Sequence, residues 1–213
     1  MSIQVLGVSG SPVKNSNTDR LVQAVLASTG LEAEFVKLSN IMVRPCHACK
    51  RCVEDNVCKV RDDFPSLAEK VKQAGALIVG GYSPYRSLDA FSKAFLERLW
   101  SLRHVKNLVR GKLAVTVVTG TRPETRDRVS EMMAMEMIMD RMELLGQLKV
   151  QGNVPCLTCG EGDTCEMSGV PRIFGQNAKA SADKCVRVED QTEVWEEAQR
   201  LGRLMGERLR NIA

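Results

Sequence analysis

Short apolar runs alternate with amphipathic stretches along the whole chain. The apolar runs have the length of buried strands, and they cover residues 3–8, 32–38, 76–80, 112–119 and 148–154. Between them, apolar residues recur at helical spacing over residues 19–28, 62–74, 89–100 and 124–145, and again from about residue 190. Alternating strands and helices predict an α/β fold, with a parallel sheet, right-handed crossovers and helices on both faces.

The helix expected over residues 124–145 carries apolar side chains on two faces. Met132, Met135, Met139 and Met142 share one face, whereas Met133, Met137 and Leu144 lie on another. A surface helix needs only one apolar stripe, so the second stripe predicts packing against another subunit. Adaptable packing explains these methionines better than metal binding.

A polar loop separates the first strand from the first helix. Ser16 or Asn17 is placed to cap this helix. A helix N-terminus offers unpaired backbone N–H groups and the positive end of a dipole to a phosphate. The loop follows neither the G-x-G-x-x-G nor the Walker A pattern, so dinucleotide and nucleoside triphosphate binding are disfavoured. By itself, the loop fits a phosphate site and an ordinary capping turn equally well.

Cysteines carry the most specific chemical signal in the chain. Cys46, Cys49, Cys52 and Cys58 follow the spacing C-x2-C-x2-C-x5-C, which is close to the compact spacing of bacterial [4Fe–4S] sites. Zinc sites usually pair two C-x2-C knuckles across a longer gap, so the spacing favours a cluster over a structural zinc ion. His47 lies inside this run and is expected to be exposed.

A second set of thiols follows the last expected strand. It consists of Cys156, Cys159, Cys165 and Cys185. Its spacing leaves zinc and a second iron–sulfur cluster open. Both sets follow strands, so we expect both at the carboxyl edge of the sheet, on opposite margins and roughly 19 Å apart. The loop over 166–184 has little apolar periodicity, and a bound metal would supply its order.

Composition narrows the class of protein. The 213 residues are 44% hydrophobic and 26% charged, as in an ordinary globular protein. The net charge of +4 is spread along the chain, and aromatic residues make up only 4%, so nucleic-acid binding is not expected. No apolar run approaches the roughly 18 residues of a membrane span, and no signal peptide is recognisable, so a cytoplasmic location is expected. In that compartment, the eight cysteines indicate metal ligands or redox groups in place of disulfides.

Two motifs together resemble a known family. Ser9-Gly10-Ser11-Pro12 with Ser16-Asn17-Thr18 resembles the FMN-phosphate loop of the flavodoxin-like NADPH-dependent FMN reductases, and the first cysteine run narrows the resemblance to the iron–sulfur flavoproteins. The resemblance implies strand order 2-1-3-4-5. It also implies flavin contacts from three loops, with Ser9, Ser11, Pro12, Ser16, Asn17 and Thr18 in the first, Pro84, Tyr85, Arg86 and Ser87 in the second, and Thr119, Gly120 and Thr121 in the third. Many relatives have paired glycines in the third loop, where this chain has one.

The resemblance implies an FMN- and [4Fe–4S]-dependent oxidoreductase. Electrons would come from ferredoxin or NAD(P)H, and no side chain is named as acid, base or nucleophile. A homo-oligomer, dimer or tetramer, is implied, in which one subunit's cluster approaches a neighbour's flavin. Two alternatives remain: an NAD(P)H-dependent FMN or quinone reductase with structural zinc, and a non-enzymatic electron carrier or metal-dependent binding module. The expected organisation is an FMN-binding domain over 1–154 with a cysteine loop at 40–60, a second cysteine lobe over 155–189, and a C-terminal helix over 190–213.

Overall fold

A five-stranded parallel sheet forms the centre of the protein in a computed structural model that describes residues 4–211. The strands lie in the order β2-β1-β3-β4-β5, which confirms the predicted flavodoxin-like topology. Their bounds are Val5–Ser9 for β1, Ala33–Lys37 for β2, Ala76–Tyr82 for β3, Leu113–Gly120 for β4 and Glu143–Gln151 for β5. Ile3, the first residue of the expected first strand, lies outside the described residues.

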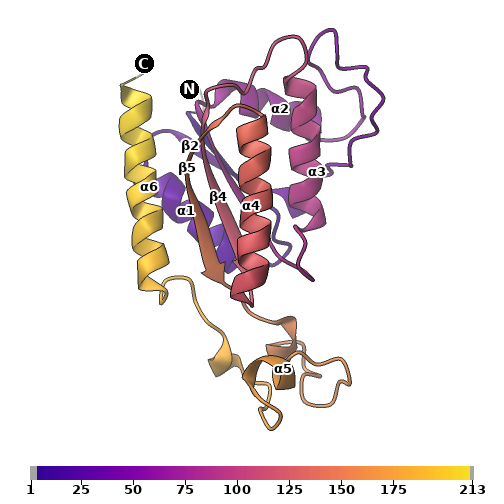
Figure 1. Ribbon diagram of the computed structural model, residues 1–213, viewed down its shortest axis with the longest axis vertical. Coiled ribbons are helices and arrows are strands. Elements are labelled where there is room, and N and C mark those ends of the chain that lie inside the picture. The colour runs from indigo at the N-terminus through magenta and orange to yellow at the C-terminus, as the bar shows by residue number, and fades with distance from the viewer. Residues whose placement is uncertain (1–3, 212–213) are drawn as a thin grey trace.

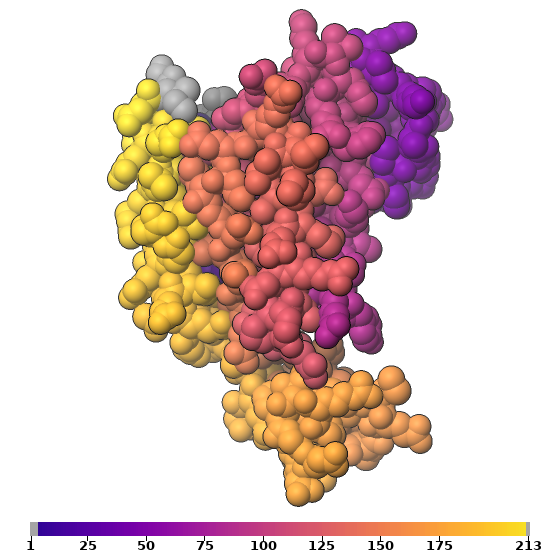
Figure 2. Space-filling model, viewed as in Figure 1, coloured from indigo at the N-terminus to yellow at the C-terminus, as the bar shows by residue number. Residues whose placement is uncertain are grey.

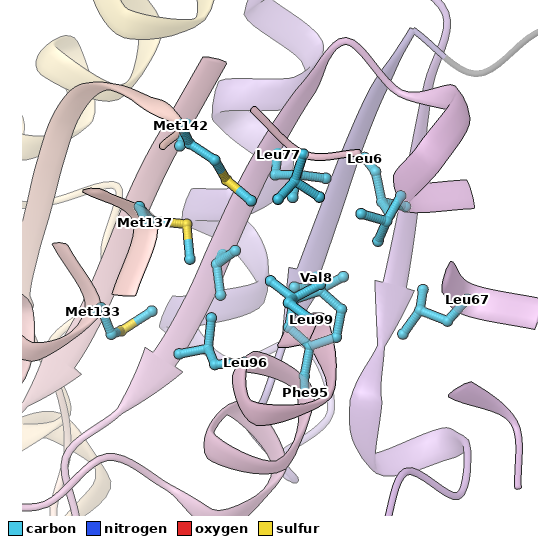
Figure 3. Close-up of a cluster of buried hydrophobic side chains, with 14 of the residues drawn as sticks. Leu6, Val8, Leu67, Leu77, Phe95, Leu96, Leu99, Met133, Met137 and Met142 are labelled. Carbon is cyan, nitrogen blue, oxygen red and sulfur yellow. The ribbon is translucent and has the colours of Figure 1, made fainter. Parts of the chain in front are cut away.

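Helices cover both faces of the sheet, as predicted (Figure 1). Helices α1 (Asn17–Ser28) and α6 (Thr192–Arg210) pack on one face, and α2 (Phe64–Gln73), α3 (Ala90–Arg98) and α4 (Pro123–Met139) pack on the other. The apolar side chains that α2, α3 and α4 bury against the sheet form one cluster with strand residues such as Leu77, and this cluster includes Phe95, Leu96 and Met133 (Figure 3). The central strands are buried on both sides, which explains why their sequences are continuously apolar.

The boundary between α4 and β5 differs from the prediction. The helix ends at Met139, whereas the sequence predicts a helix to residue 145 and a strand only from residue 148. Arg141 adopts a left-handed conformation with φ of 60°, and its carbonyl accepts a hydrogen bond from Gly111 N at 2.8 Å. This turn redirects the chain without glycine or proline, so no sequence signal marks it.

The early end of α4 also changes the assignment of its methionines. Met133 and Met137 are buried against the sheet, and Met142 is buried too, because it precedes β5 and faces the core. The prediction that Met142 shares one helical face with Met132, Met135 and Met139 is therefore wrong. Met132, Met135 and Met139 are exposed, and Met139 is 62% exposed. The second apolar stripe of α4 thus has no partner within the described chain.

A small lobe extends from the carboxyl end of the sheet, between β5 and α6 (Figures 1 and 2). It contains two 3₁₀ turns, η3 (Pro155–Leu157) and η4 (Ala182–Lys184), and the short helix α5 (Val170–Phe174). Regular secondary structure is sparse here, in agreement with the weak apolar periodicity of its sequence. Across residues 4–211, no helix has both the length and the apolar character needed to cross a membrane.

Candidate functional site

The three loops expected to contact a flavin meet at the carboxyl end of the sheet. The hydroxyl groups of Thr18, in the first turn of α1, and Thr119, at the end of β4, lie 2.7 Å apart. Ser83, which follows β3, donates its N–H to the carbonyl of Thr119 at 2.8 Å. Loops that are far apart in sequence are thereby joined at the point where β1, β3 and β4 end, the ligand position typical of open parallel sheets.

The first loop presents a helix N-terminus with a complete capping box. Ser16 is the N-cap, as predicted; its hydroxyl accepts from Asp19 N at 3.1 Å, and its own N–H donates to the Asp19 carboxylate at 3.2 Å. The N–H groups of Asn17 and Thr18, at the start of the helix, have no partner within it and remain available to an anion. Ser9 instead donates its hydroxyl proton to Asp19 at 2.6 Å, so it supports the loop from inside.

Lys37 is a residue of this site that sequence reasoning missed. It ends β2, next to β1 in the sheet, and its ammonium donates to Asp19 at 2.6 Å and to the carbonyl of Val13 at 2.8 Å. The carboxylate of Asp19 is almost fully buried beside the expected phosphate position, and Lys37 compensates its charge. In the sequence, a lysine at the carboxyl end of the strand next to β1 is the feature that could have indicated this role.

Gly10 allows the first loop to reach the start of α3. A Cβ atom at this position would lie 2.0 Å from Ser92 Oγ and 2.4 Å from Asp89 Oδ1, so only glycine fits. Asp89 is the N-cap of α3 and accepts from Ser92 N at 2.8 Å and from Tyr82 N at 3.0 Å. Burial raises the pKa of Asp89 above its ordinary value despite these donors. The contact fixes the first loop against the second.

The second loop contains a strained turn that points away from the protein. Ser87 N donates to the carbonyl of Pro84 at 3.0 Å, and the two central residues, Tyr85 and Arg86, have φ of 48° and 66°. Glycine or asparagine normally occupies such positions. The Tyr85 side chain is fully exposed, while the hydroxyl of Ser83 is buried and has no hydrogen-bond partner. Backbone strain, an unsupported aromatic ring and an orphaned hydroxyl together fit a bound flavin ring.

The third loop is firmly held but offers fewer free groups. Thr119 and Gly120 end β4, and Thr121 follows the strand. The carbonyl of Gly120 accepts from Arg126 Nη1 at 2.9 Å and from Gly152 N at 3.0 Å. Thr119 already bonds to Thr18. This loop therefore bounds the site, and the hydrogen bonds of Thr119 hold the other two loops in place.

The first four cysteines line one cavity of about 670 Å³. Its other wall comes from the C-terminal half of α3 and the following turn, including Glu97, Trp100 and His104. All four thiols are free, and Cys46 and Cys49 are exposed. Asn56 ties the loop to this wall by donating its side-chain N–H to the carbonyl of Ser101 at 3.1 Å.

The backbone of this loop turns in a way that suits thiolate ligands. Ala48 and Lys50, which lie between successive cysteines, have φ of 50° and 59°, and Ala48 N donates to Cys46 Sγ at 3.4 Å. Burial, together with the nearby thiolates of the other three cysteines, raises the pKa of Cys52, whereas hydrogen bonds from Arg51 lower the pKa of Cys49. Hydrogen bonds to sulfur are among the features by which proteins tune iron–sulfur sites.

The donor set therefore fits a cluster, although its sulfurs are not preassembled. Within residues 4–211, no three Cys, His, Asp or Glu side chains are gathered closely enough to hold a metal ion. The four cysteines nonetheless line one cavity. Thiolates are the ligands that iron–sulfur clusters require.

A buried ion pair anchors both ends of the cysteine loop. Arg98 of α3 forms a two-pronged ion pair with Asp62, with N–O distances of 2.6 and 3.0 Å, and both side chains are inaccessible to solvent. Asp62 accepts from Arg44 N at 2.9 Å, and Arg98 donates to the carbonyl of Arg44 at 2.8 Å. Arg44 precedes the first cysteine, and Asp62 follows the last. Arg98 also lies beside the thiol of Cys58.

This anchoring places the first cysteine set away from the flavin loops. The loop leaves the carboxyl end of β2, but it folds along α3 to the end of that helix opposite the flavin loops, beside α2 and α3 (Figure 1). The nine residues of α3 span about 13 Å between these ends. The expectation that both cysteine sets lie at the flavin edge is therefore wrong for the first set. Arg98 binds both ends of its loop and holds the loop at the C-terminal end of α3.

The second cysteine set lies in the lobe, as its sequence position requires. Cys159 and Cys165 are exposed, and Cys156 and Cys185 are partly buried. The sulfur of Cys156 accepts a hydrogen bond from Gly169 N at 3.3 Å. The lobe lies at the opposite end of the molecule from the loop that carries the first set (Figure 1), so the two sets are far apart in the structure.

Comparisons with known proteins agree with this geometry. The family model described as NADPH-dependent FMN reductase matches residues 3–150. The chain is 34% identical to an iron–sulfur flavoprotein of Methanocaldococcus jannaschii over 119 residues, which cover 53% of this chain and 62% of that protein. It is 28% identical to an iron–sulfur flavoprotein of Methanosarcina thermophila over 155 residues, which cover 71% of this chain and 78% of that protein. The Trp repressor binding protein of Bacillus subtilis shares the fold, with a TM-score of 0.61, 18% identity and coverage of 93% and 98%.

Proposed function

The chain belongs to the family of NADPH-dependent FMN reductases, on its iron–sulfur flavoprotein branch, and we propose that it couples FMN to a [4Fe–4S] cluster. Membership makes it a flavin-dependent oxidoreductase. The proposed reaction passes electrons between a reduced donor, ferredoxin or NAD(P)H, and an acceptor. The observation that carries the proposal is the single cavity lined by Cys46, Cys49, Cys52 and Cys58 in a chain with a complete set of flavin loops.

The residues of the chain divide this work between two places. The start of α1, with the hydroxyls of Ser11 and Thr18, binds the FMN phosphate, and the strained Tyr85–Arg86 turn covers the ring. The cavity cysteines hold the cluster, and Arg98 and Asp62 fix the loop that carries them. When bound, FMN exchanges one or two electrons and a cluster exchanges one, so a protein with both can couple two-electron hydride transfer to one-electron transfer.

Cofactor loading tests the proposal directly. Protein purified without oxygen should contain FMN together with at least about four irons and matching acid-labile sulfide per chain. Cys52→Ala should remove about four irons and the associated visible absorbance while leaving FMN bound, because the flavin loops lie at the other end of α3. Val57→Ala, in the same loop but without a sulfur, should retain both cofactors. Zinc at this site without acid-labile sulfide would instead establish a reductase with structural zinc.

We also propose that the protein is a homo-oligomer. On α4, Met135, Ile138 and Met139 are 56%, 53% and 62% exposed and lie on neighbouring turns. Glu136, from the same stretch of helix, lines the cysteine cavity, so this apolar face borders the proposed cluster. Contiguous exposed apolar surface of this kind is typical of protein interfaces. A neighbouring subunit that covers it would bring its own flavin loops toward the cavity.

Sedimentation velocity of the cofactor-loaded protein checks this arrangement. The wild-type chain should sediment as a dimer or tetramer, and Ile138→Glu should shift it to a smaller species, because a buried unpaired charge opposes association. Arg203→Glu, which changes an exposed position on α6, provides the matched control and should leave the assembly intact. A monomeric wild type, or equal effects of both substitutions, contradicts an interface on α4.

A further inference from the structure

The lobe between β5 and α6 lacks an apolar core of its own. Among residues 155–189, Leu157 and Val170 are the buried apolar side chains apart from Val188, which packs with α1 and α6. Two such side chains cannot offset the entropy of ordering a segment of this length. We infer that Cys156, Cys159, Cys165 and Cys185 bind one thiolate-coordinated metal centre that orders the lobe and, through it, the phosphate loop. This inference assigns a second metal site beyond the proposed cluster.

Hydrogen bonds hold the first three of these cysteines in one compact group of turns. Cys156 Sγ accepts from Gly169 N at 3.3 Å, and Cys159 Sγ donates to the carbonyl of Cys156 at 3.7 Å. The neighbouring Ser168 donates its N–H to the carbonyl of Cys165 at 3.0 Å. Three thiols therefore leave the same compact group of turns.

The fourth cysteine is brought in from the far side of the lobe. Ala180 N donates to Asp163 at 2.6 Å, which holds the segment before η4 against the turn that leads into Cys165. Cys185 follows that turn directly and donates its N–H to the carbonyl of Ala182 at 3.0 Å. The sulfurs are not yet gathered, and the exposed side chains of Cys159 and Cys165 complete the centre by moving inward. Zinc and iron–sulfur clusters both take this donor set.

The segment that follows Cys185 connects the lobe to the first flavin loop. The carbonyl of Val186 accepts from the side-chain amide of Asn17 at 3.0 Å, and Glu189 pairs with Arg20 at 2.6 Å. Asn17 and Arg20 both lie in the first turn of α1, where the phosphate is expected. A metal that fixes Cys185 thus also fixes the support of that turn. This second part of the inference rests on the proposed flavin site.

Metal analysis of variants tests the site without reference to turnover. The full chain, purified without oxygen, should hold about one zinc ion or about four irons in addition to the metal that Cys52→Ala removes. Cys156→Ala/Cys185→Ala should lose this fraction and keep the metal of the first set. Thr158→Ala, in the same turn, should lose neither. Zinc together with unchanged iron identifies a zinc site, and a loss of iron with sulfide identifies a cluster.

The wild-type chain provides a readout that does not depend on the stability of a variant. Alkylation followed by mass spectrometry should show the four lobe thiols protected until a strong chelator is added. Labelling without chelator, labelling only after a reductant, or equal metal content in wild type and Cys156→Ala/Cys185→Ala each overturns the metal site.

The link to the phosphate loop has its own measurement. FMN should bind Cys156→Ala/Cys185→Ala on the order of tenfold more weakly than wild type. Without the metal, Asn17 and Arg20 lose their ordered partners, so FMN binding itself must order them, and this lowers the affinity. Riboflavin, which lacks the phosphate, should be affected less. Loss of metal with unchanged FMN affinity overturns the link and leaves the metal site standing. Failure of the flavin proposal appears separately, as absence of FMN from the wild-type protein.

Discussion

Asp62→Ala is expected to lower the free energy of unfolding of the cofactor-free protein by about 3–5 kcal/mol, because it leaves the buried guanidinium of Arg98 without its partner. The substitution also removes the acceptor for Arg44 N and Phe64 N, at 2.9 and 3.1 Å. Urea unfolding followed by circular dichroism measures the change. The loop between Arg44 and Asp62 should at the same time become a preferred site of limited proteolysis, because both of its ends are released.

A double-mutant cycle separates the ion pair from simple loss of packing. Asp62→Leu/Arg98→Met should be less destabilised than either single substitution, because no charge is left buried without a partner. Asp55→Ala serves as a control in the same loop, since its pair with Lys59 is exposed to solvent and should leave unfolding unchanged. Additive effects of the two single substitutions would show that the pair does not anchor the loop.

The dependence of this effect on pH follows from the pKa of Asp62. Burial acts to raise that pKa, but the ion pair with Arg98 and the N–H groups of Arg44 and Phe64 outweigh it and hold the pKa below its ordinary value. A lowered pKa in the folded state stabilises the fold above the unfolded value of about 3.9, and the contribution is lost as the pH falls through the folded value. The stability difference between wild type and Asp62→Ala should therefore shrink below about pH 4.

The sequence predicts the sheet well because its strands are buried on both faces. The continuous apolar runs around Leu77 and Val115 are buried in the structure, as expected for strands that are covered on both faces. Ser16 marks the start of α1, because its hydroxyl caps the helix. The end of α4 could not be predicted, because Arg141 takes a left-handed turn that carries no glycine or proline. The apolar residues that follow it satisfy both helical and strand patterns.

The course of the cysteine loop depends on a contact that leaves no local pattern. Asp62 has the sequence context of a helix cap, and Arg98 that of a helix C-terminus, and only tertiary structure pairs them. The same holds for Asp19 and Lys37, which come from α1 and β2 and meet only when helix and sheet pack together. Spacing motifs identify the ligand residues, whereas the residues that position them become visible only when distant elements are packed together.

Lys37→Met should weaken FMN binding on the order of 100-fold, because it leaves the carboxylate of Asp19 uncompensated next to the phosphate. Asp19 is 2% exposed and cannot recruit water freely in place of the lost ammonium. Its repulsion acts on the phosphate, so riboflavin binding should change much less. Fluorescence titration of the flavin-free protein with FMN and with riboflavin measures both affinities.

Two further variants show whether charge is the cause. Asp19→Asn/Lys37→Met removes both charges and should recover most of the FMN affinity, since the amide still accepts a hydrogen bond from Ser9. Lys70→Met provides the control. Lys70 of α2 pairs with Glu34, which lies on β2 as Lys37 does, but this pair is more exposed, so the substitution should leave FMN binding unchanged. Equal losses of FMN and riboflavin in Lys37→Met would contradict the electrostatic account, because a general collapse of the loop does not distinguish a ligand with a phosphate from one without. Selective loss of FMN, restored when the opposing charge is also removed, would place the phosphate at the start of α1 by its charge alone.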